Sequence, residues 1–213
     1  LNQFSDIELE KIQFISAEKQ FLDGNKNNAL KLFEEYLEMY PKGAYVSGAS
    51  YYLAELNFEN GLNEKALFFY KTLIEDKVST YTEKALVRII NILKNDSKES
   101  EAIFYMERLS NIASFKQNKR FAKLNLMKAY FATKEYEKCL DLYERALQMA
   151  PDESTRINTL NNIARLDWNL GRYSEAVDRA LEALALAEEM NILTYKVDAT
   201  KIIADSYQDM GKY

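Results

Sequence analysis

Five small side chains recur along this chain at a nearly constant spacing. They are Ala29, Ala66, Ala102, Cys139 and Ala176, and the gaps between them are 37, 36, 37 and 37 residues. A spacing this regular indicates tandem supersecondary units that stack on one another. A small side chain at the same point of each unit allows two antiparallel helices to approach closely.

Turn-forming residues follow the same spacing. Gly24, Gly61, Gly171 and Gly211 each follow a helical run, and the first three precede a second one. Pro41 and Pro151 end amphipathic runs, LFEEYLEMYP and LYERALQMAP, because proline cannot continue a helix. With 6 glycines and 2 prolines in 213 residues, the chain has too few turn residues for a strand-rich fold. We therefore expect an all-α fold, opened by a capping box of Ser5 with Glu8.

The repeating unit resembles the tetratricopeptide repeat, a helix pair of about 34 residues. The fifth unit, INTLNNIARLDWNLGRYSEAVDRALEAL, is the most similar. It has residues of the expected size at the family's packing positions, namely Leu160, Ile163, Ala164, Gly171, Tyr173, Ala176 and Ala183. The resemblance implies a right-handed α-solenoid of five helix pairs plus an unpaired or truncated sixth first helix, in a single array over residues 1–213. The units span approximately residues 5–41, 45–77, 79–113, 117–151, 154–190 and 194–213.

The third and sixth units depart from the family pattern. In the third unit, Ile90 replaces the small residue of the first helix, and the turn KNDSKES has no glycine. The first two units resemble periplasmic, envelope-associated repeat proteins of bacteria, which favours the periplasm slightly over the cytoplasm. The sixth unit lacks a second helix, so we expect an apolar face around Ile202, Ile203 and Tyr207 to be exposed. A continuing chain is the favoured cover for that face, and end-to-end self-association through this helix is the alternative.

The resemblance also places one face of each first helix on the inner wall of the solenoid. The middle units carry Lys84, Arg88, Lys128 and Arg165 there, without a carboxylate among the mapped positions. Arginine and lysine suit a carboxylate, and asparagine can donate and accept bonds along a peptide backbone. The predicted partner is thus a protein or extended peptide, acidic or with a C-terminal carboxylate. The predicted binding residues are Tyr52, Lys84, Arg88, Asn91, Asn125, Lys128, Asn158, Asn162, Arg165 and Asn169.

Plainer interpretations stay open for these side chains. Each polar residue can simply be solvated, and Trp168 can pack against the next helix instead of meeting a ligand. Tyr51 and Tyr52 cannot both point the same way, so at least one of them is expected to pack. Cys139 occupies the small-residue position, which predicts a buried, inert thiol.

The composition argues against several classes of function. The chain has no histidine and one cysteine, which removes the usual catalytic bases and the ligands of a zinc site, so we expect no enzyme activity, metal or cofactor. Neither a G-x-x-x-x-G-K-[ST] nor a G-x-G-x-x-G loop is present. A net charge of −5 disfavours nucleic acid, and no apolar run is long enough to span a membrane.

Three functions remain from the sequence. The first is a protein-binding or peptide-binding scaffold that uses the inner wall. The second is a structural segment of a larger bacterial envelope-associated assembly protein. The third is the peptide-sensing domain of a bacterial signalling regulator, whose output domain would lie outside this segment.

Overall fold

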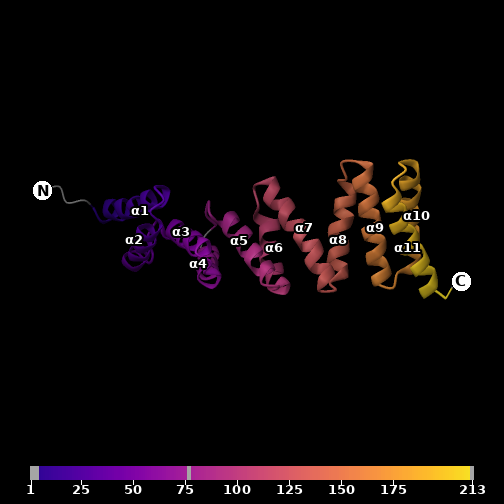
Figure 1. Ribbon diagram of the computed structural model, residues 1–213, viewed down its shortest axis with the longest axis horizontal. Coiled ribbons are helices and arrows are strands. Elements are labelled where there is room, and N and C mark those ends of the chain that lie inside the picture. Colours follow the sequence, from indigo (N-terminus) through magenta and orange to yellow (C-terminus); the bar gives the residue numbers. More distant parts are fainter. Residues whose placement is uncertain (1–4, 76–77, 212–213) are drawn as a thin grey trace. The chain divides into compact units, whose positions relative to one another are not determined.

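The fold is described by a computed structural model that covers residues 5–75 and 78–211 (Figure 1). Within those ranges the chain forms eleven α-helices and no strand, as the sequence predicts. The helices are α1 (Asp6–Leu22), α2 (Lys26–Met39), α3 (Val46–Glu59), α4 (Asn63–Glu75), α5 (Thr82–Asn95), α6 (Glu99–Ile112), α7 (Lys116–Ala132), α8 (Tyr136–Gln148), α9 (Glu153–Asn169), α10 (Tyr173–Glu189) and α11 (Leu193–Asp209).

The turn inside each helix pair contains one residue with a left-handed backbone. Gly24, Gly61 and Gly171 have φ values of 79°, 73° and 75°, and glycine adopts this conformation without strain. Ser97 and Lys134, with φ values of 56° and 62°, occupy the same place in the third and fourth pairs. These five residues repeat at intervals of 37, 36, 37 and 37, so the turn is kept even where glycine is absent.

The small residues identified in the sequence lie where the two helices of a pair meet. Ala29, Ala66, Ala102, Cys139 and Ala176 are all completely buried. Each one follows the left-handed turn residue by five positions, in the first turns of the second helix. The regular spacing in the sequence therefore reflects a recurring close approach of two helices.

The chain divides into two compact bodies, residues 1–122 and 123–213, with the boundary inside α7. In the N-terminal body, Phe14, Phe33 and Tyr36 form the centre of an aromatic core. The Phe14 and Tyr45 rings stack with centroids 4.8 Å apart. Gly48 leaves room for the Phe14 ring, since a Cβ there would lie 2.9 Å from Phe14 Cζ. At its start, α1 carries the predicted capping box: the Ser5 amide donates to Glu8 Oε2 at 2.8 Å, and the Glu8 amide donates to Ser5 Oγ.

In the C-terminal body, small side chains bring α9, α10 and α11 together. Ala164, Ala176 and Ala180 form one buried cluster with Ile202 of α11. The expectation that Ile202 lies on an exposed face is therefore wrong, because α11 turns this residue onto α9 and α10, where it is 5% exposed. Tyr207 is exposed as expected, together with Leu193 and Val197.

Each first helix begins within three residues of the position at which its predicted unit starts. Helices α7, α9 and α11 each begin one residue before the predicted start of their unit, at Lys116, Glu153 and Leu193. The last two residues of the predicted second unit, 76–77, and of the sixth, 212–213, lie outside the described residues.

Candidate functional site

A cavity of about 260 Å³ lies in the C-terminal body among α7, α8 and α9. It brings together three of the predicted binding residues, one from α7 and two from α9. We call it the basic cavity, because its only charged side chains are cations. Its lining residues are Met127, Lys128, Phe131, Tyr143, Asn162, Arg165 and Leu166.

The two cations of the basic cavity are largely unused by the protein itself. Lys128 is exposed and makes no hydrogen bond or ion pair with any described residue. Arg165 Nη1 donates a long bond of 3.4 Å to Asn162 Oδ1, and its Nη2 lies 3.9 Å from Asp198 Oδ1. Most N–H donors of the guanidinium therefore stay available to a ligand.

The three predicted asparagines of α9, Asn158, Asn162 and Asn169, lie on one face of the helix, at spacings of four and seven residues. Asn162 Nδ2 donates to the Asn158 carbonyl at 2.9 Å, and Asn169 Nδ2 donates to the Arg165 carbonyl at 2.7 Å. The side-chain amides of Asn162 and Asn169 each keep one N–H that can donate to a ligand, and each carbonyl oxygen can accept a further hydrogen bond. Asn158 is exposed, and Asn162 and Asn169 are half-buried. Asn125 of α7 is buried.

The wall of the basic cavity is apolar beneath its cations. Burial raises the pKa of Tyr143, Cys139 raises it further, and Arg165 opposes the change, so the phenol remains neutral. Cys139 is free and buried, and its Sγ donates to the Met127 carbonyl at 3.2 Å. Burial raises the pKa of this thiol to about 11, which confirms the prediction of a buried, inert cysteine.

The predicted residues of the N-terminal body have different surroundings. Arg88 binds Glu55 with two parallel hydrogen bonds, from Nε at 3.0 Å and from Nη2 at 2.9 Å. Tyr70 Oη donates to the same carboxylate at 2.5 Å. The Arg88 guanidinium also lies 4.8 Å from the centroid of the Phe58 ring. The protein itself therefore uses the cation that the sequence assigned to a ligand.

Tyr52 is also used internally. Its ring stacks on Phe33 with centroids 5.1 Å apart, and its Oη donates to Glu18 at 2.7 Å. Of the adjacent tyrosine pair, Tyr52 is thus a packing residue. Lys84 is exposed, with its Nζ 5.9 Å from the centroid of the Tyr51 ring, and Asn91 is half-buried.

Trp168 packs against neighbouring helices of the C-terminal body, which was the alternative to its binding a ligand. Its ring contacts the small-residue cluster of α9 and α10. Its Nε1 donates to Asp209 Oδ2 of α11 at 2.8 Å, which anchors the end of that helix.

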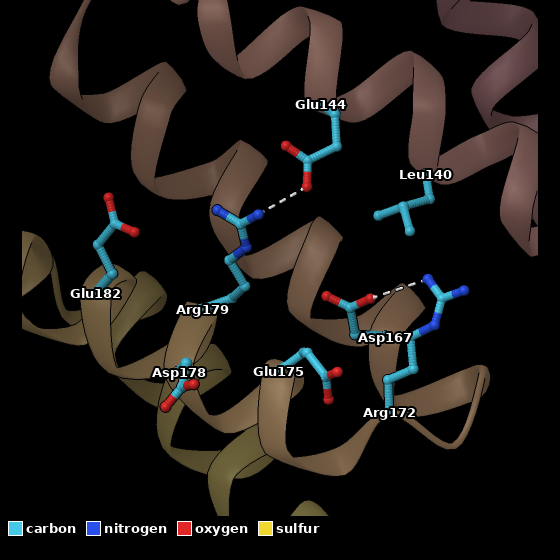
Figure 2. A pocket seen from close by; sticks show the side chains of 8 residues that line it. All are labelled: Leu140, Glu144, Asp167, Arg172, Glu175, Asp178, Arg179 and Glu182. Atoms are coloured by element: carbon cyan, nitrogen blue, oxygen red, sulfur yellow. Dashed lines mark hydrogen bonds and ion pairs between the residues drawn. The ribbon is translucent and has the colours of Figure 1, made fainter.

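A second opening in the C-terminal body was not predicted. It has a volume of about 520 Å³ and lies between α8, α9 and α10 (Figure 2). We call it the acidic cleft, since carboxylates outnumber guanidiniums in it by five to two. Its lining residues are Leu140, Glu144, Asp167, Arg172, Glu175, Asp178, Arg179 and Glu182. The sequence offered one signal, the acidic residues at three- and four-residue spacings along 175–182.

Asp167 is the most deeply placed side chain of the acidic cleft. It is 5% exposed, and its Oδ1 lies 3.9 Å from Arg172 Nη1 (Figure 2). Burial raises the pKa of Asp167 to about 6, against the opposing effects of Arg172 and Arg179. A buried carboxylate normally receives hydrogen bonds, and this one receives none from the described residues.

Residues 5–75 and 78–211 lack two other kinds of site. No group of three or more acidic or cysteine side chains in these ranges is placed to hold a metal ion. None of the helices described there is both long and apolar enough to cross a membrane.

Comparison with known proteins identifies the repeat. Residues 120–189 match the family model described as "Tetratricopeptide repeat". No curated protein sequence matches the chain.

Similar solved structures cover most of the chain at low sequence identity. A structure of YrrB, described as a TPR protein with an unusual peptide-binding site, is 11% identical, covers 89% of this chain and 90% of its own, and has a TM-score of 0.54. A tetratricopeptide repeat protein from Parabacteroides merdae is 15% identical and has a TM-score of 0.53. The match covers 95% of this chain and 74% of that protein's chain. A structure of MamA is 18% identical and has a TM-score of 0.50. The match covers 84% of this chain and 92% of the MamA chain.

Proposed function

Because residues 120–189 match the tetratricopeptide repeat and the described residues form tandem helix pairs, we propose that this chain is a non-catalytic interaction scaffold that binds a peptide carboxylate in the basic cavity. The observation that carries the proposal is the convergence of Lys128 and Arg165 on one cavity, with their donors largely unused. The peptide-binding site described for YrrB makes a peptide a reasonable ligand class for this fold.

The chemistry of the basic cavity favours a carboxylate. A planar guanidinium can bind both oxygens of a carboxylate, and an ammonium adds a third donor from another direction. Asn162, which lines the same cavity, can donate its remaining N–H to a peptide carbonyl. Phe131 and Tyr143 supply apolar surface for the side chain that precedes the carboxylate.

Binding of three labelled probe peptides tests this function. The first is acidic with a free C-terminal carboxylate, the second has the same sequence with a C-terminal amide, and the third is uncharged along its side chains with a free carboxylate. Fluorescence anisotropy at low and high salt measures each affinity. We expect the free-carboxylate peptides to bind, and added salt to weaken them. Binding of the amidated peptide alone would mean that the site recognises acidic side chains and not a C-terminal carboxylate.

Matched variants locate the site. Lys128→Gln and Arg165→Gln should each weaken binding of the free-carboxylate peptide about tenfold, since each removes a charge-assisted hydrogen bond. Arg145→Gln is the control, because Arg145 is an exposed cation of α8 that pairs with Asp141 and lies outside the cavity. Equal affinities for all three variants and the unchanged chain would contradict the proposal.

A further inference from the structure

The acidic cleft contains two carboxylates without a partner among the described residues, Glu175 and Asp178. A third, Asp167, has only a long ion pair, 3.9 Å from its Oδ1 to Arg172 Nη1. Its two guanidiniums are already engaged, Arg179 with Glu144 at 2.8 Å and Arg172 with Glu137 at 2.6 Å. Glu182 accepts a hydrogen bond from Arg156. By contrast, Asp167, Glu175 and Asp178 receive no hydrogen bond from any residue that the structure describes.

Asp167 distinguishes this cleft from an ordinary acidic surface. Its side chain is more than nine-tenths buried, yet its nearest cationic atom, Arg172 Nη1, is 3.9 Å away and beyond hydrogen-bond distance. Figure 2 shows the Asp167 carboxylate facing the opening beside Arg172. Keeping a carboxylate buried without a donor is unfavourable, so a cation that enters the cleft would relieve that cost.

The fold does not require an acid at the place of Asp167. A cleft of about 380 Å³ occurs 110 residues earlier, where Asn57 stands in the position of Asp167, each four residues before the left-handed turn glycine. Phe68 and Phe69 there replace Asp178 and Arg179. The repeat therefore builds the cleft, while its side chains give each copy a different chemistry.

We propose that the acidic cleft binds an arginine or lysine side chain of a partner protein. The cationic head pairs with Asp167 and Glu175, and Leu140 packs against the methylene stem. A volume of about 520 Å³ is sufficient for such a side chain. The acidic cleft and the basic cavity share no residue, so this proposal stands independently of the carboxylate site.

A peptide without terminal charges tests the proposal. It contains one arginine among glycines and serines, and it is acetylated and amidated so that the basic cavity has no carboxylate to bind. Its partner peptide has citrulline, the neutral analogue, in place of arginine. Titration of the whole chain, followed by NMR of backbone amides around Gly171, measures both affinities. We expect saturable shifts with arginine and at least a tenfold weaker response with citrulline.

Variants separate this site from other acidic surfaces. Asp167→Asn and Glu175→Gln should each weaken the arginine peptide about tenfold, and Glu175→Gln changes only an exposed side chain, which protects the test against misfolding. Asp141→Asn, an exposed acid of α8 outside the cleft, should leave the affinity unchanged.

The possible outcomes are decisive. An absence of saturable shifts with the arginine peptide would overturn the proposal, as would equal affinity for citrulline or unchanged affinity in Asp167→Asn and Glu175→Gln. Lys128→Gln and Arg165→Gln should not alter arginine binding. Failure of the carboxylate site and failure of the acidic cleft are therefore distinguishable.

Discussion

One position of the first helices carries opposite charges in the two bodies. It lies six residues before the left-handed turn residue of each repeat. In the N-terminal body it is Glu18, then Glu55, and in the C-terminal body it is Lys128, then Arg165. Asn91 stands between them in the series, with a neutral side chain.

The two bodies also treat these charges differently. Glu18 accepts a hydrogen bond from Tyr52, and Glu55 accepts bonds from Tyr70 and Arg88. Lys128 has no such bond within the described residues, and Arg165 has one long contact with Asn162 and one distant carboxylate. The repeat thus fixes where a side chain lies on its helix, while the neighbouring helices decide whether its charge is used internally or left for a ligand.

The largest expected effect comes from removing the cation of the N-terminal body. In Arg88→Met, the buried carboxylate of Glu55 loses its cation and keeps only the neutral hydroxyls of Tyr70 and Tyr51 as partners. We expect the free energy of unfolding of this body to fall by about 3 kcal/mol. This is the low end for a buried ion pair, because the Arg88 side chain is 40% exposed. Hydrogen exchange of the α3–α5 amides in a urea series measures the change.

A double variant sharpens this test. Glu55→Met with Arg88→Met removes both charges, and we expect it to recover most of the lost stability because no buried carboxylate is left unpaired. Lys84→Met is the control on the same helix, since its side chain is exposed. Additive losses in the double variant would show that the two residues do not act as a pair.

A smaller change in stability is expected when Asp167 is replaced. Whereas Arg88→Met lowers the free energy of unfolding, Asp167→Asn should raise it relative to the unchanged chain as the pH increases. Its pKa in the folded protein is about 6, above the ordinary value of 3.8, so the folded chain favours the protonated form. The stabilisation is therefore complete below about pH 4 and is lost as the pH rises through 6. Glu144 and Glu175 add to this effect, and Arg172 and Arg179 oppose it.

Asp167→Asn removes that dependence on pH. Since one pKa unit corresponds to about 1.4 kcal/mol, we expect the stability of the variant relative to the unchanged chain to rise by about 2 kcal/mol between pH 4 and pH 7.5. Fluorescence of Trp168 in urea follows the C-terminal body, since the chain has one tryptophan. Asp141→Asn should show no such rise. A constant difference across this pH range would mean that Asp167 is already compensated.

The sequence predicted the helices and their pairing well. The recurring small residues and the turn glycines both follow from backbone geometry, which is local and repeats with the chain. Ser97 and Lys134 were missed as left-handed turn residues because neither is glycine, and the demands of the helix pair impose the conformation there. Ile202 was misplaced, because the direction of its side chain depends on how α11 rests on α9 and α10.

The candidate site could be predicted only in part. Lys128, Asn162 and Arg165 were assigned to one wall by repeat position, and they do line one cavity. Arg88 was assigned to the same kind of wall, but its partner Glu55 lies 33 residues earlier on another helix. The acidic cleft takes its side chains from three helices. Contacts between helices depend on side-chain reach, which the spacing of residues along one helix does not contain.

The smallest effect on stability is expected at the cations of the basic cavity. Lys128→Gln and Arg165→Gln should each change the free energy of unfolding of the C-terminal body by less than about 0.5 kcal/mol, because exposed charges without close partners contribute little. Urea unfolding followed by Trp168 fluorescence measures this. Arg165 is the sharper case, since it has the contact with Asn162. A loss comparable to that of Arg88→Met would mean that Arg165 also holds the fold together, and the contrast between the two bodies would disappear.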